Sequence, residues 1–197
     1  MKFKNTIVIL IVSLTLCLSA AMTVFFFTQE MNRPRLLVLG RIQDFSLTDS
    51  TGDVFHSSQL KGKVWVADFI FSTCADLCPM MSKNMAALHR SFQGVSDVDL
   101  VSITVNPEVD TPEVLAQYAK RFNAQTHNWH FLTGPRDEIQ KIAVESFKLG
   151  AIEDPVFHSS YFSLIDRYGY LRGYYDGSAQ KDRNRLLKDI ARLRKEK

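Results

Sequence analysis

Residues 64–79 read Val64-Trp65-Val66-Ala67-Asp68-Phe69-Ile70-Phe71, followed by Ser72-Thr73-Cys74-Ala75-Asp76-Leu77-Cys78-Pro79. The first eight are nearly all apolar, which is typical of a central β-strand that is covered on both faces. Proline is tolerated in the first turn of a helix but not in its interior. The sequence therefore predicts a strand, a loop carrying Cys74, and a helix over residues 80–92 with Cys78 near its start.

The rest of the chain alternates in the same way. Helices are predicted over residues 111–123, 136–149 and 180–195, strands over 99–105 and 129–132, and a hairpin over 161–166 and 170–175. Such alternation indicates a mixed α/β layer architecture. A dithiol between the first central strand and a helix is the arrangement of a thioredoxin-like fold, so we expect a central mixed sheet flanked by helices.

Composition limits the function classes. The chain has 197 residues, is 46% hydrophobic and 11% aromatic, and carries a net charge of +3. These values fit one domain plus attachments, and the charge is too small to indicate nucleic-acid binding. Residues 181–197 are basic, which we interpret as the solvated face of a terminal helix.

The N-terminus is expected to lie outside the fold. Residues 6–27 contain no charged side chain and are long enough to cross a hydrocarbon core of about 30 Å. We predict an uncleaved membrane anchor (residues 1–28) that buries the Cys17 thiol, a tether (29–41) and a domain (42–197). The short stub before the span and the lack of an arginine-rich presequence favour a single-pass protein of the bacterial inner membrane, with its domain in the periplasm.

Cys74 and Cys78 could form a soft-metal site, a redox pair or a structural disulfide. Residues four apart on a helix have Cβ atoms about 5–6 Å apart, whereas a disulfide needs about 3.5–4.5 Å. A loop position for Cys74 permits either chemistry. Because Cys78 is nearer the positive end of the helix, we expect it to have the lower thiol pKa, although Asp76 opposes this effect. A structural disulfide would close only a small loop and stabilise little.

A metal site needs a third ligand, and histidine is the natural candidate. The chain offers five, which are His56, His89, His127, His130 and His158. Each is expected to be a surface or packing residue by default. Only His158, just before the strand at residues 161–166, lies on an element that can approach the dithiol. The same three ligands could hold Zn(II), but structural zinc sites usually have four.

Several segments together resemble the Sco/SenC proteins: Phe71 to Pro79, Asn106-Pro107-Glu108-Val109-Asp110-Thr111-Pro112-Glu113, Leu132-Thr133-Gly134, and His158-Ser159 followed by Leu164-Ile165-Asp166. The resemblance implies a membrane-anchored, thioredoxin-like copper protein that supports assembly of the dinuclear copper centre of cytochrome c oxidase. It places the copper ligands on Cys74, Cys78 and His158. The sequence departs from the family's usual residues at Ala75, Asn106 and Phe157, none of which is a ligand.

Two functions remain to be weighed. The first is a metallochaperone that binds Cu(I) or Cu(II) and delivers it to the copper-bearing subunit of cytochrome c oxidase or to another periplasmic cuproprotein. The second is a thiol–disulfide oxidoreductase that uses Cys74 and Cys78 as a redox-active pair to reduce the copper-site cysteines of a partner. An oxidoreductase has no use for His158, so we favour copper binding and leave open whether the protein is also an enzyme.

Overall fold

A computed structural model describes residues 2–31, 35–74, 77–124, 127–149 and 160–196, and in the first range the side chains of residues 12–28. The chain divides into two units, Met1–Arg35 and Leu36–Lys197. The second unit begins before Ile42, where the sequence analysis starts the domain. Residues 36–41 belong to it because part of this segment pairs with a strand of the sheet.

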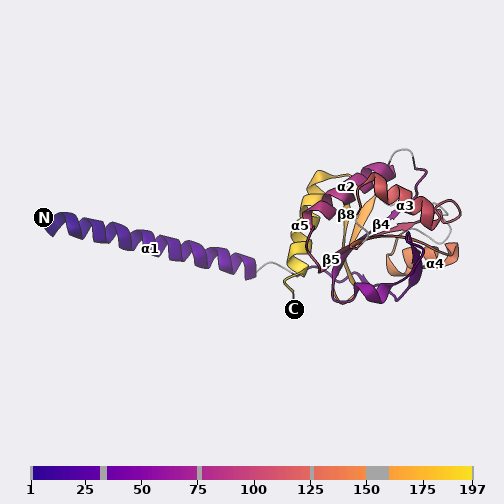
Figure 1. Ribbon diagram of the computed structural model, residues 1–197. Helices are drawn as coiled ribbons and strands as arrows, with labels where there is room; N and C mark the ends of the chain where they lie inside the picture. The colour runs from indigo at the N-terminus through magenta and orange to yellow at the C-terminus, as the bar shows by residue number, and fades with distance from the viewer. Residues whose placement is uncertain (1, 32–34, 75–76, 125–126, 150–159, 197) are drawn as a thin grey trace. The chain divides into compact units, whose positions relative to one another are not determined.

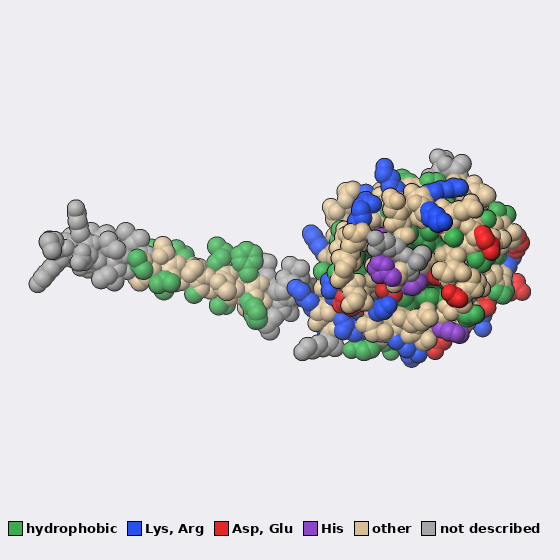
Figure 2. Space-filling model, viewed as in Figure 1, with side chains coloured by type: hydrophobic (Ala, Val, Ile, Leu, Met, Phe, Trp, Pro, Cys, Tyr) green, Lys and Arg blue, Asp and Glu red, His purple; other side chains and the backbone are tan. Residues whose placement is uncertain are grey.

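The first unit consists mainly of helix α1 (Lys2–Met31). The hydroxyls of Thr15, Ser19 and Thr23 each donate to a carbonyl three or four residues earlier, so these polar groups are satisfied within the helix. Figure 2 shows hydrophobic side chains along its described part. Within the described residues, no helix meets the length and hydropathy required of a membrane span. The span predicted for residues 6–27 is therefore not confirmed.

The second unit is built on one mixed sheet of eight strands in the order β1-β8-β7-β4-β5-β6-β2-β3. The strands are β1 (Gly40–Arg41), β2 (Ser46–Asp49), β3 (Val54–His56), β4 (Val64–Ile70), β5 (Val98–Thr104), β6 (Trp129–Thr133), β7 (Tyr161–Ile165) and β8 (Tyr170–Asp176). Strands β4, β5 and β6 are parallel, whereas β7 is antiparallel to β4 and to β8. The predicted α/β class is confirmed.

Strand β4 is buried on both faces, as its apolar run predicts. Val64, Val66 and Ile70 join the core beneath helices α2 (Leu77–Ser91), α3 (Pro112–Arg121) and α5 (Gln180–Leu193). The alternate residues Trp65, Ala67 and Phe69 join a second core on the other face, which is covered by η1 (Ser57–Leu60), α4 (Arg136–Lys141) and η2 (Ile142–Ser146). Figure 1 shows these helices on opposite sides of the sheet.

The helix starts follow local sequence rules. Helix α3 begins after Thr111, whose Oγ1 accepts a hydrogen bond from the Val114 amide at 3.4 Å, and Pro112 occupies its first position. Helix α4 continues as the π-helical turn η2, in which the Phe147 amide donates to the carbonyl of Ile142. Phe147 is fully buried, with its ring 5.2 Å from that of Phe69. The predicted helix at residues 136–149 is thus shorter and less regular than expected.

The sequence analysis missed three short strands at the N-terminal side of the domain. Strand β2 pairs with β3 and with β6, and its Leu47 lies in the second core. A Cβ atom on Gly134 would lie 2.7 Å from Leu47 Cδ2, so a larger residue just after β6 would displace the Leu47 side chain. Strands of two to four residues carry too few positions for an alternating pattern to be recognised.

A polar group is enclosed in the core beneath α2. Asp68 is 0% exposed on the same face of β4 as Val66 and Ile70. Its Oδ1 accepts from Ser102 at 2.6 Å, and Ser102 accepts in turn from the Trp129 indole at 3.0 Å. Among the described residues, Asp68 Oδ2 has no hydrogen-bond partner. Burial raises the pKa of Asp68 to about 7, which outweighs the opposing effect of the Ser102 hydrogen bond.

The raised pKa of Asp68 predicts that the free energy of unfolding depends on pH. Between about pH 4 and 7 the folded state binds this proton more tightly than the unfolded state, so stability falls as pH rises through that window. Asp68→Asn removes the titration. We expect the free energy of unfolding of the variant, relative to the parent, to increase from pH 4 to pH 8 in urea titrations of Leu36–Lys197.

Asp44→Asn is the matched control, because the Asp44 side chain is 80% exposed. Its stability should follow that of the parent at every pH. An Asp68→Asn difference that does not change with pH would contradict the assignment of this buried titration.

Candidate metal centre

The predicted site residues Cys74 and Cys78 lie where β4 meets α2. The chain leaves β4 after Ile70 and turns, and the Cys74 amide donates to the Phe71 carbonyl at 3.2 Å. Helix α2 begins at Leu77, so Cys78 lies in its first turn and Cys74 lies outside it. Pro79 is the third residue of the helix, where its missing N–H costs no helical hydrogen bond. This arrangement confirms the local structure predicted from Pro79.

The two cysteines are in contact. The backbone amide of Cys78 donates to Cys74 Sγ at 3.4 Å, and no disulfide joins the two sulfurs. Cys78 is 5% exposed and joins the core with Met81, whereas Cys74 is half-buried. The pair therefore presents one sulfur toward the surface and one toward the interior. A soft cation or a partner's sulfur would meet Cys74 first.

The helix N-terminus was expected to lower the pKa of Cys78, but this pKa is raised. Burial raises the pKa of this thiol to about 12, and a backbone hydrogen bond involving Phe71 lowers it only in part. The adjacent Cys74 and the charge of Asp68 raise it further. Position near a helix N-terminus lowers a thiol pKa, whereas desolvation of the sulfur raises it. In Cys78 the cost of placing a negative charge in the core is larger.

Asp110 holds the cysteine loop to the neighbouring loop after β5. It is fully buried, and its carboxylate accepts hydrogen bonds from the amide and hydroxyl of Ser72 and from Thr104 Oγ1, the last at 2.5 Å. Thr104 Oγ1 accepts in turn from the Asn106 amide at 3.0 Å. These bonds fix Ser72, two residues before Cys74. Asp110 stands inside the motif at residues 106–113, but the sequence analysis gave it no role.

The described histidines have partners elsewhere or lie at the surface. His56 contacts Ser46, His89 contacts Asn128, His130 lies between Asp49 and Asp99, and His127 is exposed. In the part of the chain that is described, no group of three or more His, Cys, Asp or Glu side chains forms a metal-binding cluster. The third predicted ligand, His158, lies outside the described residues.

The described residue that follows His158 most closely is Ser160, and its position is fixed. Its carbonyl accepts from the Gly177 amide at 2.8 Å. A Cβ atom on Gly177 would lie within 2.5 Å of the sulfur of Met81, which stands three residues after Cys78 on α2. Ala67 pairs with Ser163, so continuing this antiparallel register places Ser160 level with Ile70 at the end of β4. Two independent contacts thus bring the start of β7 to the dithiol end of the sheet.

Comparison with known proteins gives consistent matches. The SCO1/SenC family model matches residues 40–195. The SCO1 protein homolog of Bacillus subtilis is 34% identical over 157 residues, which cover 76% of this chain and 80% of the relative.

Two solved structures are also similar. BsSco, described as a member of the Sco family of cytochrome c oxidase assembly proteins with a disulfide switch, matches with a TM-score of 0.72 and 31% identity over 83% of this chain and 100% of its own. Copper-bound ScoI of Arabidopsis thaliana matches with a TM-score of 0.64 and 27% identity over 78% and 99%. Because the family model spans most of the chain and the B. subtilis relative is 34% identical over most of both chains, this protein belongs to the SCO1/SenC family.

Proposed function

We propose that this protein is a metallochaperone that binds copper through Cys74, Cys78 and His158 and delivers it to the copper centre of a respiratory cytochrome c oxidase. The observation that carries the proposal is the contact between Cys74 and Cys78 at the junction of β4 and α2, where no disulfide joins the two sulfurs. Copper is the cargo of this site. Thiolates select Cu(I), and imidazole accommodates both Cu(I) and Cu(II).

The buried position of Cys78 favours a thiolate that is bound to a cation over a thiolate that is not. Its thiol resists ionisation because the core solvates a thiolate poorly. A bound cation supplies the positive charge that the core lacks, so metal binding and loss of the thiol proton are coupled. Cys74 is the more accessible sulfur, and it is therefore the ligand through which copper would enter and leave.

The position of Ser160 supports His158 as the third ligand. Ser160 lies level with Ile70 at the end of β4, and Cys74 follows Ile70 by four residues. Two residues of extended chain span at most about 7 Å. These positions support a histidine two residues before Ser160 as the third donor, and no described histidine joins the two cysteines in a cluster.

The relatives support copper as the cargo. The similar structure of A. thaliana ScoI contains copper, and BsSco is assigned to cytochrome c oxidase assembly. We extend these properties to this protein, with a copper-bearing oxidase subunit or another periplasmic cuproprotein as the recipient.

Copper titration tests the three-ligand site. Reduced Leu36–Lys197 should bind one Cu(I) per chain in competition with a chromogenic Cu(I) chelator. His158→Ala should weaken binding at least about tenfold, equivalent to ~1.4 kcal/mol, because one of three donors is lost. Cys74→Ser and Cys78→Ser should each abolish competition with the chelator, because a hydroxyl is a poor ligand for a soft ion.

His127→Ala is the matched control, since His127 is exposed and is not assigned to the site. It should bind Cu(I) as the parent does. Equal affinities of the His158→Ala variant and the parent would exclude His158 as a ligand.

A second function, thiol–disulfide exchange, is favoured by the contact between the Cys78 amide and the Cys74 sulfur. In this reaction Cys74 and Cys78 form a disulfide while a disulfide in the partner's copper site becomes two thiols, so that two electrons and two protons pass to the partner. The disulfide switch described for BsSco supports it.

Metal-free, reduced Leu36–Lys197 should reduce an oxidised copper-site peptide that contains two cysteines, with one peptide reduced per chain as measured by thiol labelling and mass spectrometry. His158→Ala should keep this activity, because the imidazole carries no electrons in the exchange. Loss of peptide reduction in His158→Ala together with intact copper binding would contradict the assignment of His158 to copper binding and of the exchange reaction to the two cysteines.

We also propose that α1 anchors the protein in the bacterial inner membrane with Leu36–Lys197 in the periplasm. The uncharged run at residues 6–27 and the exposed Phe25, Phe26 and Phe27 support this proposal, because such side chains are stable in lipid and not in water.

The full-length chain should remain in the membrane fraction after alkaline carbonate extraction, and Leu36–Lys197 expressed without α1 should be released. In spheroplasts, external protease should degrade the domain. Extraction of the full-length chain by carbonate would exclude an integral anchor, and protection of the domain would exclude the proposed orientation.

A further inference from the structure

A patch of exposed apolar side chains lies at one end of the domain. The patch consists of Leu37, Val38, Leu39, Tyr168 and Tyr170, whose exposed fractions are 74%, 60%, 42%, 59% and 36%. These are five of the nine large hydrophobic side chains that are exposed among the described residues of Leu36–Lys197. The two segments that carry them are neighbours, because Arg41 pairs with Tyr170 and the Leu39 amide donates to the Leu171 carbonyl. Single exposed apolar residues are common, but several on neighbouring segments indicate a binding surface.

The aliphatic part of the patch is held rigidly against the sheet. The Leu39 amide donates to the Leu171 carbonyl at 2.8 Å, and Gly40 and Arg41 pair with β8. Arg172, which is only 9% exposed, donates to the carbonyls of Leu36 and Leu37 at 2.9 and 3.2 Å. The segment therefore keeps its leucine and valine side chains exposed and cannot turn them into the core.

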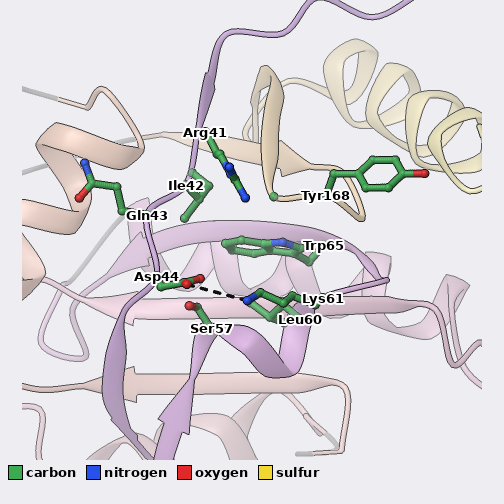
Figure 3. A pocket seen from close by; sticks show the side chains of 10 residues that line it. Arg41, Ile42, Gln43, Asp44, Ser57, Leu60, Lys61, Trp65 and Tyr168 are labelled. Atoms are coloured by element: carbon green, nitrogen blue, oxygen red, sulfur yellow. Dashed lines mark ion pairs between the residues drawn. The ribbon is translucent and has the colours of Figure 1, made fainter.

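Two arginines flank the aliphatic segment in the sequence. Arg35 and Arg41 flank the sequence Leu36-Leu37-Val38-Leu39-Gly40, and Arg41 places its guanidinium 5.8 Å from the Tyr170 ring centre. Arg41 also lines a shallow pocket with Lys61, Trp65 and Tyr168, in which Lys61 pairs with Asp44 at 3.8 Å (Figure 3). In that view the Trp65 indole lies between Arg41 and Lys61.

Leucine, tyrosine and arginine together are the composition of a surface that lies in a membrane interface. The aliphatic chains enter the acyl boundary, tyrosine rings lie at the headgroup level, and arginine binds lipid phosphate. The covalent link to α1 also limits how far the patch can lie from the membrane anchor that we propose for α1. Four residues separate the end of α1 at Met31 from Leu36, a distance of at most about 18 Å between the two residues.

We propose that Leu37, Val38, Leu39, Tyr168, Tyr170 and Arg41 form a second membrane contact, which seats the domain on the surface of an anionic bilayer. This contact goes beyond copper binding and does not depend on it. It also orients the site. Strand β8 runs parallel to β4, so the patch at the start of β8 lies at the N-terminal end of β4, whereas Cys74 follows its C-terminal end.

The seven residues of β4 span about 23 Å. A domain seated on the patch therefore holds the dithiol at the far end of the sheet from the lipid, where a partner's copper site above the membrane can meet it.

The test uses Leu36–Lys197, which lacks α1. This part folds independently, because every described residue of both hydrophobic cores lies in it. Flotation with vesicles of phosphatidylcholine and phosphatidylglycerol at 70:30 should recover the domain, and vesicles of phosphatidylcholine alone should recover less. Raising NaCl from 0.1 to 0.5 M should weaken binding, because the arginine contribution is screened.

The double variant Leu37→Ser with Val38→Ser should reduce the partition coefficient about tenfold. The control, Val54→Ser with Val109→Ser, changes two exposed valines elsewhere and should bind vesicles as the parent does. Circular dichroism and Cu(I) titration should be unchanged in both, so loss of vesicle binding is distinguished from failure of the copper site.

Three outcomes would overturn the proposal. The parent domain does not float with anionic vesicles, the two double variants bind equally, or light scattering shows a dimer that Leu37→Ser with Val38→Ser converts to a monomer. The last result would assign the patch to contact between copies of the chain.

Discussion

The burial of β4 on both faces is the constraint on which the rest of the domain depends. Helices α2, α3 and α5 cover one face, and α4 with η2 covers the other, so the strand ends at a fixed point between two packed layers. The chain must turn sharply there before α2 begins. Cys74 lies in this turn, and Cys78 lies in the first turn of α2. The packing of β4 therefore determines where both sulfurs lie, although neither cysteine belongs to that strand.

Asp110 completes this arrangement by joining the turn to the loop after β5. Its carboxylate is fully buried and accepts hydrogen bonds from Ser72 and Thr104, which replace the water it loses. A loop fixed in this way keeps two thiols together without a disulfide. In the copper site that we propose, the charge of the bound cation would offset the cost of ionising Cys78 in the core.

Much of the fold was predictable because its signals are local. The apolar run of β4, the Thr111–Pro112 helix start and the hairpin of β7 and β8 each follow from a few neighbouring residues. Strands β1, β2 and β3 were not predictable in this way, because they are short and are stabilised by partners far away in the sequence. The raised pKa of Cys78 was missed for a similar reason. It depends on how α2 packs on β4, which no local pattern reports, and the role of Asp110 depends on a contact across 38 residues.

X-ray absorption spectroscopy of Cu(I)-loaded Leu36–Lys197 tests the central claim most directly, because it counts the donor atoms around copper. The account predicts two sulfur donors and one nitrogen donor in the parent, with the nitrogen lost in His158→Ala and one sulfur lost in any copper-bound Cys74→Ser. A first shell of sulfur alone in the parent, or one unchanged by His158→Ala, would contradict it.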